Sequence, residues 1–222
     1  AAGGVQFVFT CLGDGTSVEQ NLFGPSGAAA SLAPGAIVVD FTTIAPIEAE
    51  GIAARLKESG VHYLDAPVSG GDIGARNGTL TIMVGGEPGA FTRTLPLLSL
   101  VGKNIEHIGP AGFGQRMKAA NQVAVALNNI GLTEALSFAV NSGLDPEQTL
   151  RILGSGAAGS WALSNYGPRL LNGEFGPGFF AAHMLKDLRI AETEARRSGV
   201  ELPGVGLMIR MYEQLCGLRV KC

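Results

Sequence analysis

The chain has 222 residues, of which 46% are hydrophobic and 16% are charged, which is enough for one large domain or two modest ones with their own cores. Its net charge is −3 without any basic run, which argues against a nucleic-acid partner, and charges or glycines interrupt the apolar stretches, so we expect neither a membrane span nor a signal sequence. The three cysteines show neither metal-ligand spacing nor an even disulfide framework, so we expect no metal site and a reducing, cytoplasmic setting.

Strands and helices alternate through the first half. Short apolar runs predict buried strands at Val5–Leu12, Ala36–Thr43, Val61–Gly70, Thr79–Gly86 and Asn104–Gly109. Helices are predicted between them at Gly15–Phe23, with Thr16 or Ser17 as the N-cap, at Pro46–Lys57 and at Glu87–Val101. This alternation predicts a mostly parallel sheet covered on both faces.

The second half has only helical patterns. Apolar periodicity predicts one long helix over Gln115–Gly143, with Gly143 as its stop. Further helices are predicted from Asp145 as a cap to Leu153, and at Trp161–Leu171, Phe180–Ser198 and Pro203–Leu218. The predicted fold is therefore an α/β part over residues 1–110 followed by an all-α part over residues 111–222, joined by the long helix.

A literal G-x-G-x-x-G occurs at Gly154, Gly156 and Gly159. A phosphate-binding loop of this pattern must follow a strand and open a helix, whereas this one follows a predicted helix. We therefore interpret it as a turn between helices.

The segment Asp65–Gly71 leaves a predicted strand and turns at Ser69-Gly70-Gly71. Backbone N–H groups at such a turn can converge on an anion, although a plain strand-ending turn is the alternative. The segment Asp40–Thr43 ends the preceding strand at the same edge of the sheet. Ligands of open α/β sheets bind at that edge, which favours a functional site.

The segment Gly112–Asn121 opens the long helix and places Lys118 and Asn121 on one helix face. A lysine near an apolar cleft can serve as an acid or a base, although an ordinary solvated lysine is the alternative. Lys186 and Asp187 are adjacent on a later helix, where neighbouring side chains do not face each other and a solvated face is the alternative.

These segments, in this order, resemble the β-hydroxyacid dehydrogenase family, which includes 3-hydroxyisobutyrate dehydrogenase and tartronate semialdehyde reductase. The resemblance covers essentially the whole chain. The family's D-x-S-T-x-x-P motif is matched at Asp40–Pro46, with Thr42 in the serine place, and its D-A-P-V-S-G-G motif is matched at Asp65–Gly71. Its G-x-G-x-x-x-K-x-x-N motif is matched by Gly112, Gly114, Lys118 and Asn121. Its K-D-L motif is matched at Lys186–Leu188.

The resemblance implies an oxidoreductase that interconverts a small β-hydroxy acid and its semialdehyde or oxo acid by hydride transfer with NAD or NADP. It implies a Rossmann-like NAD(P)-binding portion over residues 1–110, and a substrate and dimerisation domain over residues 111–222 that forms a homodimer or homotetramer. Lys118 would be catalytic. The implied substrate-binding residues are Ser69, Gly70, Gly71 and Asn121, and the implied cofactor-binding residues are Cys11, Leu12, Thr43, Lys186 and Asp187.

The chain departs from the family at its start, because the sequence begins about where the family's fourth strand begins. The G-x-G-x-M/A-G loop that holds the pyrophosphate is therefore not in it, and we expect weak cofactor binding by this chain alone. Two alternatives stay open: an imine reductase-like enzyme, against which Lys118 argues, and a non-catalytic oligomerisation module on the same fold.

Overall fold

The computed structural model describes residues 2–176 and 178–217. The chain divides into two compact units. The first contains Ala1–Asn121 and Arg189–Glu201, and the second contains Gln122–Leu188 and Leu202–Cys222. The predicted domain boundary near residue 110 stays a prediction; the two units divide within two long helices, after Asn121 and after Leu188.

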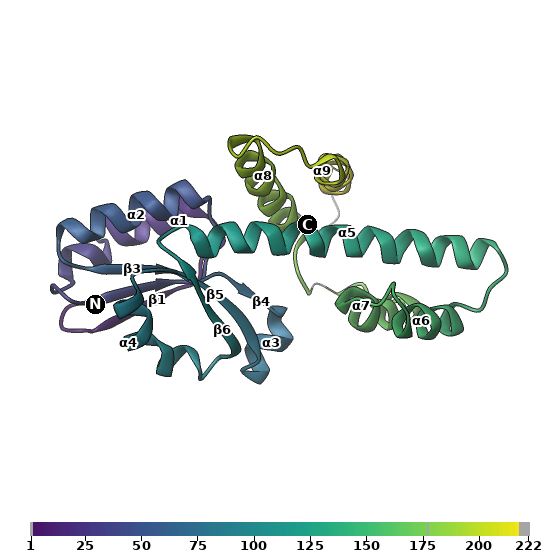
Figure 1. The fold of residues 1–222 in the computed structure, drawn as a ribbon, viewed down its shortest axis with the longest axis horizontal. Helices are drawn as coiled ribbons and strands as arrows, with labels where there is room; N and C mark the ends of the chain where they lie inside the picture. The colour runs from purple at the N-terminus through teal and green to yellow at the C-terminus, as the bar shows by residue number, and fades with distance from the viewer. Residues whose placement is uncertain (1, 177, 218–222) are drawn as a thin grey trace. The chain divides into compact units, whose positions relative to one another are not determined.

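The first unit is built on a six-stranded sheet (Figure 1). Its strands are β1 (Phe7–Thr10), β2 (Ile37–Asp40), β3 (His62–Asp65), β4 (Val68–Ser69), β5 (Leu80–Gly86) and β6 (Gly102–Gly109). The order is β1-β2-β3-β5-β4, with β6 also paired to β5. The pairs β1–β2, β2–β3 and β5–β6 are parallel, whereas β5 is antiparallel to β3 and β4. The predicted, mostly parallel sheet is confirmed.

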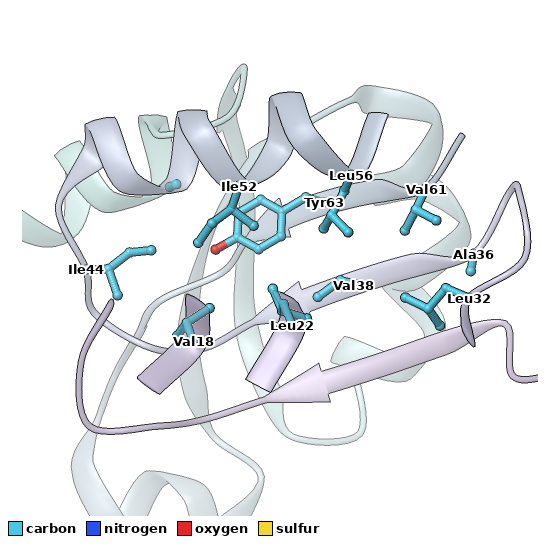
Figure 2. Packing of buried hydrophobic residues seen from close by; sticks show 11 residues of the cluster. Val18, Leu22, Leu32, Ala36, Val38, Ile44, Ile52, Leu56, Val61 and Tyr63 are labelled. Carbon is cyan, nitrogen blue, oxygen red and sulfur yellow. The ribbon is translucent and has the colours of Figure 1, made fainter. Parts of the chain in front are cut away.

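Helices cover both faces of this sheet. On one face, α1 (Gly15–Phe23) and α2 (Pro46–Glu58) form a hydrophobic core with β2 and β3 (Figure 2). On the other face, α4 (Pro88–Leu98) contributes Ala90 and Leu98 to a second core with Ile37, Val39 and Leu64. All four residues of β2 are buried, which is the pattern of a strand covered on both sides.

Three local predictions for this unit were wrong, and two short helices were missed. The N-cap of α1 is Asp14, whose Oδ1 accepts the Ser17 N–H at 2.7 Å, rather than Thr16 or Ser17. β1 is only half-buried, with Phe9 44% exposed, because it lies at one end of the strand order. The run predicted as one strand over Val61–Gly70 splits into β3 and β4. The helix α3 (Gly71–Asn77) and the 3-10 helix η1 (Ala28–Ser31) were not predicted.

The second unit is helical, and no strand occurs in its described residues. The long helix α5 (Phe113–Asn141) enters it, followed by α6 (Pro146–Ser155), α7 (Trp161–Leu171), α8 (Ala181–Arg197) and α9 (Pro203–Gly217). One core joins residues of α5, α8 and α9, and another joins α5 and α7, with α6 packed against it. The predicted helices are confirmed, and Leu218, the predicted end of the last, lies outside the described residues.

The predicted helix ends in this unit have the expected chemistry. Asp145 caps α6 by accepting the Gln148 N–H at 2.6 Å, and Gly143 has a φ of 79° just past the end of α5. Gly154 lies in the last turn of α6, and Gly156 and Gly159 lie between α6 and α7, so the segment ends one helix and leads to the next, as its interpretation as a turn between helices predicted.

Within the described residues, α5 is long and apolar enough to cross a membrane by length and composition, with a mean hydropathy of 1.5. The expectation that the chain has no membrane span stays a prediction. The test is weak evidence, because the core helix of a soluble protein also meets it. Ala126 and Leu132 of α5 are buried in the two cores of the second unit.

Candidate active site

Lys118 lies in the second turn of α5 and is 7% exposed. Its Nζ donates a hydrogen bond to the carbonyl oxygen of Val68 at 2.9 Å. Val68 belongs to β4 and directly precedes Ser69. The fold therefore brings the lysine of one predicted motif to the strand of another, 50 residues earlier in the chain.

The turn at Ser69–Gly71 has a backbone that requires glycine. Gly70 has a φ of 123° and Gly71 a φ of 63°, conformations that residues with a Cβ adopt rarely. Gly71 begins α3, and a Cβ atom built on it would meet open space, so the turn lies at an open surface. Ser69 is half-buried at the end of β4. Asn121 is also half-buried, and as the third residue after Lys118 it lies on the same side of α5.

Asp65, at the end of β3, is fully buried and caps the start of α5. Its Oδ1 accepts the N–H of Gly112 at 2.8 Å, and its Oδ2 accepts the N–H of Gln115 at 2.9 Å. Burial raises the pKa of Asp65 to about 6, although these two hydrogen bonds favour the charged form and lower it. The negative charge of Asp40 on the neighbouring strand adds a smaller upward shift.

Gln115 is the site residue that sequence reasoning missed. It is 1% exposed, and its side chain forms hydrogen bonds with the backbone of the loop after β2. Its Nε2 donates to the carbonyl oxygen of Thr42 at 2.8 Å, and its Oε1 accepts the N–H of Ile44 at 3.2 Å. No sequence signal could have identified this role, because the bonded atoms are more than 70 residues away in the chain.

The loops after β1 and β2 are tied together at the carboxyl edge of the sheet. The Leu12 N–H donates to Thr42 Oγ1 at 2.9 Å. Below them, the buried Asp40 carboxylate accepts the hydroxyl groups of Thr10 at 2.8 Å and Tyr63 at 2.9 Å, and the Thr42 N–H at 3.0 Å. The predicted cofactor residues on these loops thus have a fixed backbone.

The loops after β1 and β2 carry four of the residues at the carboxyl edge of the sheet. Cys11 and Gly13 are exposed, and Leu12 and Thr43 are half-buried, so the edge presents backbone and small side chains to a ligand. Burial and the nearby charge of Asp40 raise the pKa of the Cys11 thiol. Ligands of parallel α/β sheets bind at this carboxyl edge.

Lys186 and Asp187 belong to α8 in the second unit. Lys186 Nζ lies 3.2 Å from Asp187 Oδ1, so the two adjacent side chains do form an ion pair, and the expectation that they would not face each other was wrong. Asp187 is buried, and its Oδ2 accepts a hydrogen bond from Nε2 of the buried Gln122 at 2.7 Å. The aspartate is thereby fixed beside the lysine.

Among the residues that the structure describes, no cluster of three or more histidine, cysteine, aspartate or glutamate side chains could hold a metal ion. The first unit brings together a buried lysine, a glycine-rich turn and the carboxyl edge of a sheet.

Two family models match the two halves of the chain. Residues 1–109 match the model described as the NAD binding domain of 6-phosphogluconate dehydrogenase. Residues 112–219 match the model described as NAD-binding of NADP-dependent 3-hydroxyisobutyrate dehydrogenase. Together with the carboxyl edge of the sheet, these matches define an NAD(P)-dependent oxidoreductase.

Known proteins support the same class. The chain is 49% identical over 208 residues to an uncharacterized oxidoreductase of Bacillus subtilis, covering 94% of this chain and 72% of that protein. It is 44% identical over 205 residues to the 2-hydroxy-3-oxopropionate reductase of Escherichia coli, covering 92% and 70%. The crystal structure of 3-hydroxyisobutyrate dehydrogenase from Salmonella typhimurium superposes with a TM-score of 0.90 at 28% identity, covering 98% and 76%.

The chain belongs to the β-hydroxyacid dehydrogenase family. It is an oxidoreductase that interconverts a small β-hydroxy acid and its semialdehyde or oxo acid by hydride transfer with NAD(P), as the four motifs predicted.

Proposed function

We propose that Lys118 is the residue that transfers the hydroxyl proton in this reaction. The observation that supports this role is the position of its Nζ, which is buried and hydrogen-bonded to the Val68 carbonyl oxygen, one residue before Ser69. A lysine held beside a ligand-binding turn can accept the hydroxyl proton during oxidation and return it to the oxygen during reduction. The bound nicotinamide supplies or takes up the hydride.

The turn at Ser69–Gly71 is the proposed binding site of the substrate carboxylate. Backbone N–H groups at a glycine turn of this kind can converge on an anion, and the Ser69 hydroxyl adds another donor. Asn121 lies on the same side of α5 as Lys118 and is proposed to orient the substrate hydroxyl or oxo group. A substrate whose carboxylate binds in this way would present the oxygen on its β-carbon to Lys118.

Cofactor-binding residues are proposed in each unit by itself. In the first, Cys11, Leu12 and Thr43 lie on the two loops that the Leu12–Thr42 hydrogen bond joins. In the second, Lys186 is proposed to contact the cofactor, and the buried Asp187 holds its ammonium group. The preference between NAD and NADP is not assigned.

We further propose that the protein forms a homodimer or homotetramer through its helical half and acts in the cytoplasm, without a nucleic-acid or membrane partner. Large exposed apolar side chains in the second unit support an interface between copies, because isolated soluble units rarely expose so many. They include Phe138, Leu144, Ile152, Trp161, Phe175 and Leu207.

The role of Lys118 can be tested by replacing it with alanine. Lys118→Ala should lower kcat by about 10²–10⁴-fold, the range for the loss of a general acid–base group, while the far-ultraviolet circular dichroism spectrum is retained. The control is Lys103→Ala, because Lys103 is exposed on β6. A Lys118→Ala enzyme with a rate like that of the control would contradict the proposed role.

A further inference from the structure

Gln115 is a buried amide with no role in the mechanism proposed above. Its side chain satisfies two backbone groups of one loop, the Thr42 carbonyl oxygen and the Ile44 N–H, much as a neighbouring strand would. Both groups belong to a loop that is proposed to contact the cofactor through Thr43. The amide therefore fixes that loop to the first turn of α5.

The main chain of Gln115 is held as well. Asp65 Oδ2 accepts its N–H at 2.9 Å, while Asp65 Oδ1 accepts the N–H of Gly112 at 2.8 Å. Asp65 ends β3, and it pairs in register with Asp40, which ends β2 just before the Thr42 loop. Gln115 is therefore connected, through its side chain and its backbone, to the ends of two adjacent strands.

The start of α5, with the strand ends and the loop that it bonds to, forms a junction in which the backbones are tightly packed. A methyl group on Gly114 would overlap the carbonyl oxygens of Met83 and Asp65. A methyl group on Gly85 would overlap the Asp65 carboxylate and the Gly114 nitrogen. The first turn of α5 thus packs with its backbone directly against the backbone of the strands, and its position is well defined.

Both ends of the junction lead into the proposed site. Lys118 follows Gln115 by three residues, which is about one helical turn. On the other side, Thr42 Oγ1 accepts the Leu12 N–H, so the loop held by Gln115 also holds the loop after β1. A continuous set of hydrogen bonds within the first unit therefore joins the proposed cofactor loops to the helix that carries the proposed proton-transfer residue.

We propose that Gln115 is a positioning residue of the dehydrogenase reaction: it sets the place of Lys118 relative to the Leu12 and Thr42–Ile44 loops, so that proton transfer and hydride transfer occur on one bound substrate. The inference rests on the proposed role of Lys118. Misplacing reacting groups by about 1 Å can reduce a rate about 10²-fold. Gln115 has no hydrogen bond to the Ser69–Gly71 turn, so substrate binding should change much less than kcat.

The test compares Gln115→Met, Lys118→Ala, the double variant and a control. Methionine keeps the length of the side chain and removes both hydrogen bonds. The control is Thr94→Val, because Thr94 is also fully buried in the first unit and its hydroxyl donates to Ala90 within α4, away from the site. Each enzyme is assayed for kcat, for KM of the hydroxy acid and for the primary deuterium isotope effect on kcat.

We expect Gln115→Met to lower kcat by about 10²-fold, with KM of the hydroxy acid within about threefold of wild type and a larger isotope effect, because the chemical step becomes slower. The control should retain kcat within about twofold, because Thr94 is buried in the core away from the proposed site. The kcat of the double variant should be within about threefold of the kcat of Lys118→Ala, because the effects of residues that act through each other are not additive.

The outcomes separate the two proposals. If Lys118→Ala remains near the wild-type rate, the proposed function fails. If Lys118→Ala loses activity while Gln115→Met resembles the control, the positioning role alone is wrong. A double variant slowed by the full product of both single effects would also overturn it. If Gln115→Met does not fold, Gln115→Leu takes its place with the same expectations, because leucine also removes both hydrogen bonds and is apolar.

Discussion

Replacing the buried Asp65 with asparagine should change how the stability of the protein depends on pH. The pKa of Asp65 is raised to about 6 in the folded protein, compared with about 3.9 for an unperturbed aspartate. The folded state therefore holds the proton more tightly than the unfolded state does. The stability contributed by this group is fully present below about pH 4 and is lost as the pH rises through about 6.

The size of this effect follows from the shift. A difference of about two pKa units corresponds to about 3 kcal/mol in the free energy of unfolding, of which about 2 kcal/mol falls between about pH 4.5 and pH 7. Asparagine cannot lose a proton in this range. As the pH rises, the free energy of unfolding of the wild type should therefore fall by about 2 kcal/mol relative to that of Asp65→Asn. Weaker capping of α5 by asparagine adds a difference that does not depend on pH and does not affect this change.

Urea unfolding at several pH values gives the required free energies, because urea leaves the ionic strength unchanged. Other groups near Asp65, such as Asp40 and Tyr63, are present in both proteins, so their contributions largely cancel in the difference. A difference between the two proteins that stays constant within about 0.5 kcal/mol from about pH 4.5 to pH 7 would refute the reasoning.

Three further predictions concern the first unit. Ser69→Ala should raise KM for carboxylate substrates more than for an aldehyde without a carboxylate, because a hydrogen bond to a charged group contributes about 1.5–3 kcal/mol; equal changes for both substrates would contradict the carboxylate role. NAD(P) should slow the alkylation of the exposed Cys11 in a variant whose other two cysteines are replaced by serine, and unchanged labelling kinetics at saturating cofactor would argue against a contact. Gly114→Ala should lower the free energy of unfolding by about 2 kcal/mol or more, because its Cβ would overlap backbone oxygens, whereas Gly131→Ala, in open space on the same helix, should be neutral or stabilise by up to about 1 kcal/mol; similar unfolding midpoints for the two variants would contradict this packing.

Much of the fold could be predicted because its signals are local. Apolar periodicity predicted α7 with its observed ends, and Pro46 and Asp145 marked the starts of α2 and α6. The split between β3 and β4 was missed because apolar residues continue on both sides of Pro67, from Ala66 to Val68. Proline has no N–H to donate to the sheet, although its carbonyl oxygen still accepts the Met83 N–H at 3.1 Å, so the strand breaks while its neighbour continues.

In the candidate site, too, features with a local sequence signal could be predicted and features that depend on distant contacts could not. The segments of Lys118 and Ser69 drew attention through their residue types, but an ordinary solvated lysine and a plain strand-ending turn stayed as alternatives, and their roles came from the resemblance to the family. The burial of Lys118 and its bond to Val68 were not predictable, because they depend on a pairing across 50 residues. Gln115 had no signal at all, since a glutamine in a helix is ordinarily a neutral surface choice.

The structure also gives a physical reason for two motifs to occur in one chain. Asp65 is the first residue of the D-A-P-V-S-G-G segment, and Gly112 and Gly114 are the glycines of the segment that contains Lys118. The Asp65 carboxylate binds the Gly112 N–H, and Gly114 leaves room for the backbone of Asp65. The two segments are thus the two sides of one junction, in which the strand that leads to the Ser69 turn also caps the helix that carries Lys118. Changing either side alone should displace the turn and the lysine relative to each other, and this displacement is the physical basis of the proposed positioning role of Gln115.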